Sequence, residues 1–431
     1  METVIVNGTL IVGDGETIIP EGSLILDDEI IRQVVPLKYI AYSVSDHVID
    51  ARGGYVLPGV INTHAHGLTT GPFFPYAYPP LSWERVNENL DTHLRNGTTT
   101  ILDLDGFNTP WEVDLANKRH PMRVKTATSH TPLNVKASKL INGKGLKEKH
   151  LRLTPEEMAK AGAVAIGEIG SPGTLYATSE MRARLGKEIS IPQAGAIIRT
   201  FQGNLKPGRS EIKEMISEWE LEGIIDVDDA EELYRDCYER PLKASQDAIL
   251  EAIEYSKKLN LPASLHNSPQ TKDEVLAAAK ELGPMMIALH TNYMFNSEEA
   301  LELAKEIKRY GGWVEVITGD MLGAKQQYKT TEGTFMLLRE GVVDLISTDF
   351  SGGYADPILY FIDVAVKEGV IGLAQGVAMC TWNPAKAIPG VAVDRGVLEE
   401  GKIADICITE PGNLSRVRCV LIGGEIVFNN K

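Results

Sequence analysis

Histidine and acidic residues in this chain follow short apolar segments at spacings that suit metal binding. His64 and His66 stand two residues apart at the end of the segment 56–66. Side chains at positions i and i+2 of a strand point to the same face, so the two imidazoles would lie side by side. Neutral imidazole is a common ligand of zinc and similar ions. Because His-x-His pairs also occur in surface turns, the interpretation depends on the rest of the chain.

Further candidate ligands follow other apolar segments. In chain order, the six candidates are His64, His66, Glu168, His266, His290 and Asp349. Two divalent cations about 3.5–4 Å apart need a bridging anion and several neutral donors. We therefore predict a site for two divalent metal ions, with zinc as the default and iron or manganese as alternatives that suit the same ligands.

Each candidate has an expected role at this site. Glu168 would bridge the two ions, one oxygen to each, while His64, His66 and Asp349 hold the first ion and His266 and His290 hold the second. A bridging water loses a proton near pH 7, since metal ions depress its pKa from about 15.7. Asp349 is placed to accept that proton and to pass it to a leaving nitrogen. Asp103 and Asp105 are weaker candidates for supporting the ligands, and a structural role is favoured for both.

Eight apolar segments alternate with helical patterns and must position these residues. Near-continuous apolar strands are typical of a parallel sheet covered on both faces. Eight such units predict an α/β fold, a (β/α)8 TIM barrel, whose site lies at the carboxyl ends of the strands. The expected strands lie in 58–66, 98–105, 122–129, 162–169, 261–266, 285–290, 312–317 and 342–347.

Both ends of the chain show β patterns outside the barrel. Two hairpins are expected around Asn7-Gly8 and Asp27-Asp28, and a third around Gly423-Gly424. We expect residues 1–57 and 396–431 to build one small β-sandwich beside a barrel formed by 58–395. A long insertion at about 170–240, with acidic amphipathic helices, is expected to cover the site or to build an interface.

Substrate contacts are expected from the loops around this rim. The proline-rich stretch 71–80 carries Phe73 and Phe74, which could form a lid or simply pack as an ordinary loop. His130 follows the third strand and is a candidate for substrate binding, with a supporting or structural role as the alternative. The turn after Asp349 adds three further candidates, Phe350, Ser351 and Gly352.

The composition of the chain limits the classes of partner that it could bind. The chain has 431 residues, of which 43% are hydrophobic, and a net charge of −16. An acidic chain is a poor partner for the phosphate backbone of nucleic acids, and no apolar run approaches the roughly 20 residues that span a bilayer. The four scattered cysteines indicate a reducing compartment. We expect a cytoplasmic homo-oligomer that binds a small-molecule substrate and neither nucleic acid nor membrane.

At the six candidate residues the sequence resembles the amidohydrolase superfamily. The resemblance rests on the segment 58–66, on Glu168, His266 and His290, and on Ser347-Thr-Asp349, and it extends to both termini. It implies a metal-dependent hydrolase with a composite β-sandwich. Many members with two metal ions use a carboxylated lysine on the fourth strand, whereas this chain offers a glutamate. The segments 167–170 and 348–353 look most like the enamidase-type branch.

Three functions follow from this interpretation. The leading hypothesis is hydrolysis of a C–N bond, other than a peptide bond, in a small or cyclic amide by a metal-bound hydroxide. The alternative is an aminohydrolase, or deaminase, acting on a heterocyclic base with one metal ion. Such deaminases usually carry a glutamate three residues after the histidine of the fifth strand, where this chain has Pro269. A non-catalytic scaffold would have lost ligands, whereas all six candidates are present.

Overall fold

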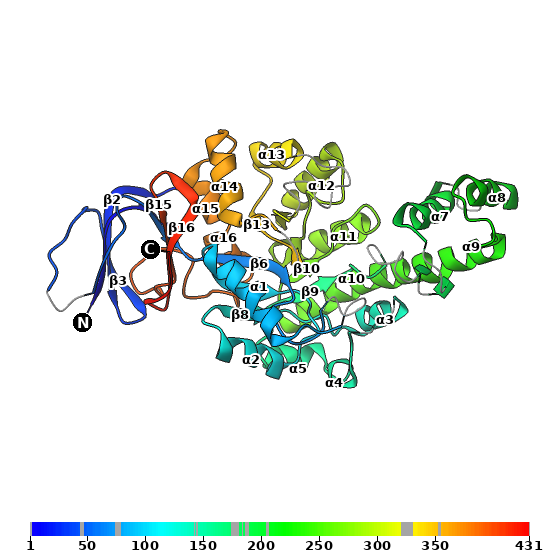
Figure 1. The fold of residues 1–431 in the computed structure, drawn as a ribbon, viewed down its shortest axis with the longest axis horizontal. Helices are drawn as coiled ribbons and strands as arrows, with labels where there is room; N and C mark the ends of the chain where they lie inside the picture. Colours follow the sequence, from blue (N-terminus) through cyan, green and yellow to red (C-terminus); the bar gives the residue numbers. More distant parts are fainter. Residues whose placement is uncertain are drawn as a thin grey trace.

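The computed structural model describes most of the chain and contains parallel and antiparallel sheets. It describes all residues except 1, 44–46, 74–78, 142, 144, 174–180, 183, 186–188, 204–206, 320–330, 352–354 and 431. The described residues form three β-sheets, of eight, five and four strands. Helices surround the two smaller sheets, and the largest sheet lies at one end of the molecule (Figure 1).

The eight-stranded sheet joins the two ends of the chain and is mainly antiparallel. Its β15 pairs with β5, so that the C-terminal strands continue the N-terminal ones. One apolar cluster contains Leu24 and Ile31 from the N-terminal strands and Ile406 and Leu421 from the C-terminal strands. The strands are β1 (Thr3–Ile11), β2 (Ile18–Asp27), β3 (Ile30–Val35), β4 (His47–Asp50), β5 (Tyr55–Pro58), β15 (Ile406–Glu410), β16 (Asn413–Ile422) and β17 (Glu425–Asn429).

The expected hairpin at Asn7-Gly8 is wrong, although the other two hairpins occur. Strand β1 continues through both residues, and its pairing with β2 shifts register on either side of Gly8. Asn7 has a φ of 57°, and a Cβ on Gly8 would lie 2.6 Å from Val56 Cγ2. The dipeptide therefore forms an irregularity within a strand, where glycine allows the close approach of β5.

The two smaller sheets contain the parallel strands that carry the candidate ligands. Strands β6, β7 and β8 pair in parallel, with β14 on the other side of β6, and β9 to β13 form the second parallel sheet. Every expected strand region contains one of these strands. They are β6 (Val60–His66), β7 (Thr98–Asp103), β8 (Arg123–Thr126), β9 (Ile166–Ile169), β10 (Ala263–Leu265), β11 (Met286–Ala288), β12 (Trp313–Ile317), β13 (Leu345–Ser347) and β14 (Phe350–Ser351).

Successive residues of these strands belong to different apolar clusters. Met286 joins a large cluster that includes the surrounding helices, whereas its neighbour Ile287 joins a second one. The second cluster also contains Ile61 and Leu102 from the four-stranded sheet and Leu345 from the five-stranded sheet. One face of each parallel sheet therefore packs against helices, and the other face shares a core with the other sheet.

Helices alternate with the parallel strands along the chain. Helix α1 begins after Ser82, whose side-chain oxygen accepts a hydrogen bond from the backbone N–H of Arg85. The helices between and after the strands are α1 (Trp83–Arg95), α2 (Pro110–Arg119), α3 (Pro132–Leu140), α4 (Glu148–Leu151), α5 (Pro155–Lys160), α10 (Arg240–Leu259), α11 (Lys272–Leu282), α12 (Ser297–Arg309), α13 (Thr331–Arg339), α14 (Ile358–Lys367), α15 (Leu373–Ala378) and α16 (Trp382–Ala387).

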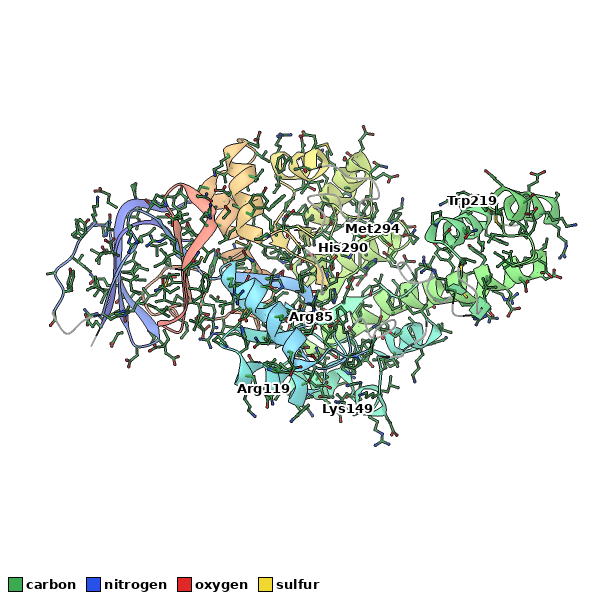
Figure 2. All side chains as sticks on the ribbon, in the orientation of Figure 1. Arg85, Arg119, Lys149, Trp219, His290 and Met294 are labelled. Carbon is green, nitrogen blue, oxygen red and sulfur yellow. The ribbon has the colours of Figure 1, made fainter. Side chains whose placement is uncertain are left out.

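The insertion after β9 folds into helices with an apolar core of their own. It contains α7 (Ile191–Gly203), α8 (Arg209–Glu218), α9 (Val227–Tyr234) and a π-helical turn (Arg235–Glu239) that leads into α10. A separate cluster holds Ile197, Ile212 and Leu233 together. These helices extend away from the parallel strands at the far end of α10, and Trp219 lies among them (Figures 1 and 2).

Among the described residues, the structure contains no helix that combines the length and apolar character needed to cross a membrane.

Candidate metal centre

Two overlapping groups of side chains offer ligand atoms for metal ions. His64, His66 and Glu168 form the first group, and Glu168, His266 and His290 form the second. Within each group the ligand atoms lie within 4.8 Å of one another, and all five residues are buried. These residues lie at or just after the carboxyl ends of β6, β9, β10 and β11. Figure 2 shows His290 in the middle of the molecule.

The first group gathers around one oxygen of Glu168. Glu168 Oε2 lies 3.8 Å from His64 Nε2 and 3.7 Å from His66 Nε2. Asp349 faces the same pair, with Oδ1 3.5 Å from each of these nitrogens. Its backbone N–H donates to the His64 carbonyl oxygen over 2.9 Å, which fixes the residue beside the end of β6. The structure therefore brings Asp349 to the first group.

The second group gathers around the other oxygen of Glu168. Glu168 Oε1 lies 2.6 Å from His266 Nδ1 and 3.4 Å from His290 Nε2. The two histidine nitrogens are 3.1 Å apart. Hydrogen bonds from these histidines outweigh burial, which alone would raise the pKa of Glu168, and hold that pKa well below its usual range. The carboxylate is therefore ionised and presents one oxygen to each group.

The donor set fits divalent metal ions. Imidazole and carboxylate together are suitable ligands for zinc, iron and manganese. His64 Nε2 is buried and has no hydrogen-bond partner within the described part of the chain, although a buried polar nitrogen is costly to leave unpaired. A metal ion between His64, His66 and Glu168 would satisfy this nitrogen. The described residues are therefore consistent with the metal dependence that the sequence predicts.

The ring nitrogens that face away from the first group are held by carboxylates. His64 Nδ1 lies 2.8 Å from Glu315 Oε1, and His66 Nδ1 lies 3.2 Å from Asp105 Oδ1. Gly67 also donates its backbone N–H to Asp105 Oδ2 over 2.8 Å. A carboxylate on Nδ1 leaves Nε2 as the nitrogen that can bind an ion. The sequence favoured a structural role for Asp105. In the structure, Asp105 instead lies where it can support the candidate ligand His66.

Sequence reasoning missed Glu315 altogether. Glu315 stands in the middle of β12 between Val314 and Val316, and its side chain is fully buried. The sequence feature that could have pointed to Glu315 is an acidic residue inside an apolar strand. A buried charge needs a partner, so such a residue is a candidate for a functional contact. Burial alone lowers the pKa of His64, but the carboxylates of Glu315 and Asp349 outweigh it and raise that pKa.

Tyr293 is a second residue that sequence reasoning missed. Its ring packs edge-on against His290, with the centroids 6.1 Å apart. Its backbone N–H donates to the His290 carbonyl oxygen over 2.8 Å. Burial and the nearby Asp349 carboxylate raise the pKa of Tyr293 to about 12. The phenol therefore stays protonated at neutral pH beside the candidate ligands.

His130, one of the expected substrate-binding residues, has contacts that are typical of a structural residue. His130 is buried, with Nδ1 3.0 Å from Thr128 Oγ1 and its ring edge-on to Phe107. Burial and the charge of His150 lower its pKa to about 4, which is typical of a neutral core histidine. These contacts favour the structural alternative for His130.

The aromatic residues of the two expected loops lie in packed positions where the structure describes them. Phe350 is buried in the core that includes the surrounding helices, and its ring lies edge-on to His93. Phe73 is 9% exposed and would contact a Cβ added to Gly67. Ser351 is partly exposed and pairs with His66 in the sheet. Phe74 and Gly352 lie outside the described residues.

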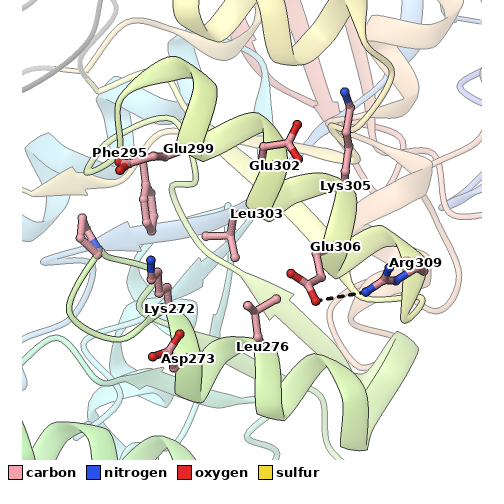
Figure 3. Close-up of a pocket in the computed structure, with 11 residues that line it drawn as sticks. Lys272, Asp273, Leu276, Phe295, Glu299, Glu302, Leu303, Lys305, Glu306 and Arg309 are labelled. Carbon is pink, nitrogen blue, oxygen red and sulfur yellow. Dashed lines mark hydrogen bonds and ion pairs between the residues drawn. The ribbon is translucent and has the colours of Figure 1, made fainter.

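A cavity of about 560 Å³ lies away from this centre, between α11 and α12. Leu276 and Leu303 form its apolar floor, and charged side chains such as Lys272 and Glu306 surround it (Figure 3). Pro269 also lines this cavity. The position at which a deaminase would present a glutamate therefore borders a separate hollow between two helices.

The model of the amidohydrolase family matches residues 55–427, most of the chain. A dihydroorotase from Clostridioides difficile (strain 630) is 25% identical over 409 residues, covering 89% of this chain and 86% of the relative. Another dihydroorotase, from Elusimicrobium minutum (strain Pei191), is 24% identical over 386 residues, covering 84% of this chain and 78% of the relative.

Solved structures share the fold across the whole chain. A prolidase complexed with N-methylphosphonate-L-proline aligns with a TM-score of 0.61 at 16% identity, covering 100% of both chains. The crystal structure of enamidase aligns with a TM-score of 0.58 at 17% identity, covering 100% of this chain and 96% of the other. At these identities the likeness concerns the fold.

Proposed function

Because this chain belongs to the amidohydrolase family, whose members include enzymes that hydrolyse C–N bonds other than peptide bonds, we propose that it hydrolyses a small or cyclic amide. The observation that carries this proposal is Glu168. Its two oxygens face two separate histidine groups, and Asp349 faces one of them. A shared carboxylate between two histidine groups suits two metal ions.

Each residue of the candidate centre would have a separate role in binding metal or transferring a proton. His64, His66 and Asp349 would hold one ion, His266 and His290 the other, and Glu168 both. When bound, the ions supply Lewis acidity, which activates water and polarises a carbonyl group. Asp349 Oδ1 faces the imidazoles, so Oδ2 would accept the proton of the attacking water and deliver it to the leaving nitrogen.

The class of substrate rests on the relatives. Dihydroorotases, by their name, act on dihydroorotate, a ring that contains amide bonds, and enamidase is a structural neighbour. The dihydroorotases favour a cyclic amide over a linear one. The enamidase-type branch rests on the segments 167–170 and 348–353. Zinc remains the first metal to try, with iron and manganese next. The expected homo-oligomer stays a prediction.

We also propose that the two parallel sheets are parts of one closed (β/α)8 barrel. An isolated parallel bridge between Thr128 and Ile166 links the region of β8 to β9. At the other side, β14 follows β13 closely along the chain and pairs with β6. With the core that both sheets share, these links support a barrel over 58–395, beside a terminal β domain of 1–57 and 396–431.

The test of the function is a metal-restored hydrolysis screen. Purified protein, loaded with zinc, iron or manganese in turn, is assayed against cyclic amides, imides and N-acyl compounds. Asp349→Asn is expected to lower kcat by at least about a hundredfold, because the proton acceptor is lost. Asp344→Asn, at the opposite end of β13, serves as the matched control and should retain activity.

Two results would contradict the proposal. Full activity in Asp349→Asn would rule out this residue as the proton carrier. Release of ammonia from an aminated ring, with one metal ion per chain, would assign the chain to deamination instead. Ring opening is followed by mass spectrometry as the addition of one water, so the two reactions are separated directly.

A further inference from the structure

Glu315 lies at a position where one carboxylate can reach both histidine groups. It belongs to β12, and the side chains of its neighbours Val314 and Val316 join the core that includes the helices. Alternation along the strand therefore directs Glu315 to the opposite face, toward the candidate metal centre. Its side chain is fully buried, so its charge needs partners inside the protein.

One oxygen of Glu315 contacts a residue from each group. Oε1 lies 2.8 Å from His64 Nδ1 in the first group. The same oxygen accepts the backbone N–H of His290, in the second group, over 3.3 Å. The carbonyl oxygen of Glu315 also accepts the backbone N–H of Thr291 over 2.9 Å. Glu315 therefore holds the ring of one candidate ligand and the main chain of another.

The contact with His290 acts on an unusual backbone. His290 has a φ of 36°, in the left-handed region that residues with a side chain rarely adopt. This conformation directs the ring so that Nε2 lies 3.1 Å from His266 Nδ1. His290 Nδ1 has no hydrogen-bond partner within the described residues, so the ring lacks the support that His64 receives. The main-chain contacts to Glu315 supply that support instead.

We propose that Glu315 is a positioning residue shared by both metal positions. The proposal rests on the two-metal function above and concerns this chain's own support for the ions. Loss of the carboxylate would free the His64 ring and relax the turn at His290 together. Residues that support a metal ligand typically change metal affinity by about 10–100-fold.

Asp105 provides the matched comparison, since it supports the first group through His66 and Gly67. Both acids are buried, and both hold a ring nitrogen of the His-x-His pair. If Glu315 serves both positions, Glu315→Gln should weaken two binding events, whereas Asp105→Asn should weaken one. Comparing the two variants distinguishes support that Glu315 gives to both metal positions from a general effect of removing a buried charge.

The experiment is a metal titration that needs no turnover. Wild type, Glu315→Gln and Asp105→Asn are stripped with a chelator, checked for folding by circular dichroism, and titrated with Co²⁺ and Zn²⁺ against a chromophoric competitor. Wild type should bind two ions per chain. Asp105→Asn should lose about 10–100-fold in affinity for one ion, and Glu315→Gln should lose that much for both.

The proposal would be overturned if Glu315→Gln lost affinity for only one ion or kept its affinity for both. Binding of a single ion by the wild type would also overturn it. If Glu315→Gln does not fold without metal, Glu315→Asp takes its place, with weakening of both ions again expected. Failure of the hydrolysis screen with two ions bound would reject the proposed function while leaving the role of Glu315 intact.

Discussion

Glu168 holds the candidate centre together because its two oxygens have different neighbours. Oε2 faces the histidines of β6, and Oε1 faces His266 and His290. A glutamate is long enough to reach both sides from β9, and its ionised form suits positive ions. At the scale of single residues, the geometry around Glu168 is the basis for proposing two ions and not one.

Tyr293 should contribute to catalysis without holding metal. Tyr293→Phe removes a protonated phenol that lies beside His290 and near Asp349. We predict that this phenol donates a hydrogen bond to the negative charge that develops on the substrate. Loss of such a bond costs about 1.5–3 kcal/mol, so kcat/KM should fall by roughly tenfold to a hundredfold. Metal content, measured by atomic absorption, should stay unchanged.

Tyr310→Phe, at the end of α12, is the matched control for this prediction and should behave as wild type. An unaltered kcat/KM in Tyr293→Phe would show that the phenol has no part in the reaction. Loss of metal from the variant would show instead that the hydroxyl of Tyr293 helps to hold the ligand set.

At the scale of elements, helix α2 begins with a capping box that is tied to a second helix. Thr109 and Glu112 exchange hydrogen bonds, and Glu112 Oε1 lies 3.1 Å from His150 Nε2 and 2.5 Å from Lys149 Nζ. Burial alone would raise the pKa of Glu112, but these contacts outweigh it and lower the pKa from 4.5 to about 2. The carboxylate therefore joins α2 to α4.

The depressed pKa of Glu112 predicts a loss of stability in acid. A carboxyl whose folded pKa lies below its unfolded value stabilises the protein above pH 4.5, and this is lost as the pH falls toward about 2. The free energy involved is on the order of 3 kcal/mol. Glu112→Gln should lower the urea midpoint at pH 7, and the difference from wild type should shrink between pH 4.5 and pH 3.

Glu157→Gln is the matched control, because Glu157 forms the same capping box at the start of α5 but is exposed to water. Its effect on the free energy of unfolding should stay within about 0.5 kcal/mol. An equal loss in both variants, or a constant difference between Glu112→Gln and wild type across this pH range, would contradict the assignment to the contacts with Lys149 and His150.

At the scale of the whole molecule, the apolar clusters divide the chain into parts that should respond separately. The helices of the insertion pack around Ile212 and Leu233, apart from the core of the parallel sheets. Ile212→Ala should destabilise the insertion by roughly 2–5 kcal/mol. Hydrogen exchange should increase within 191–239, while β11 and β12 stay protected, because local opening follows cooperative units.

Ile346→Ala removes the same atoms from β13, in the core that includes the surrounding helices. Exchange should then increase across the parallel sheets, including the strands that carry the candidate ligands. If Ile212→Ala instead exposed the whole chain, the insertion would be part of one cooperative unit with those sheets, and the separation of the cores would have no energetic meaning.

The sequence alone determined the strands and the residues at their ends. Apolar segments of the right length predict buried parallel strands, and the carboxyl ends of such strands meet at one edge. His64, His66, Glu168, His266, His290 and Asp349 could therefore be expected to lie together, and the structure brings them together. This inference needs only local pattern and one rule of fold geometry.

The tertiary structure decided which acidic side chains support that set, since the sequence offered Asp105 only as a weaker candidate and did not point to Glu315. Glu315 meets His64 across 251 positions of sequence, and Asp105 meets His66 across 39, through the register of strands that no local pattern specifies. The same holds for Asn7-Gly8, where the approach of β5 turns an apparent hairpin into an irregular strand. Local propensity selects an element, but contacts between distant elements decide how its side chains are used.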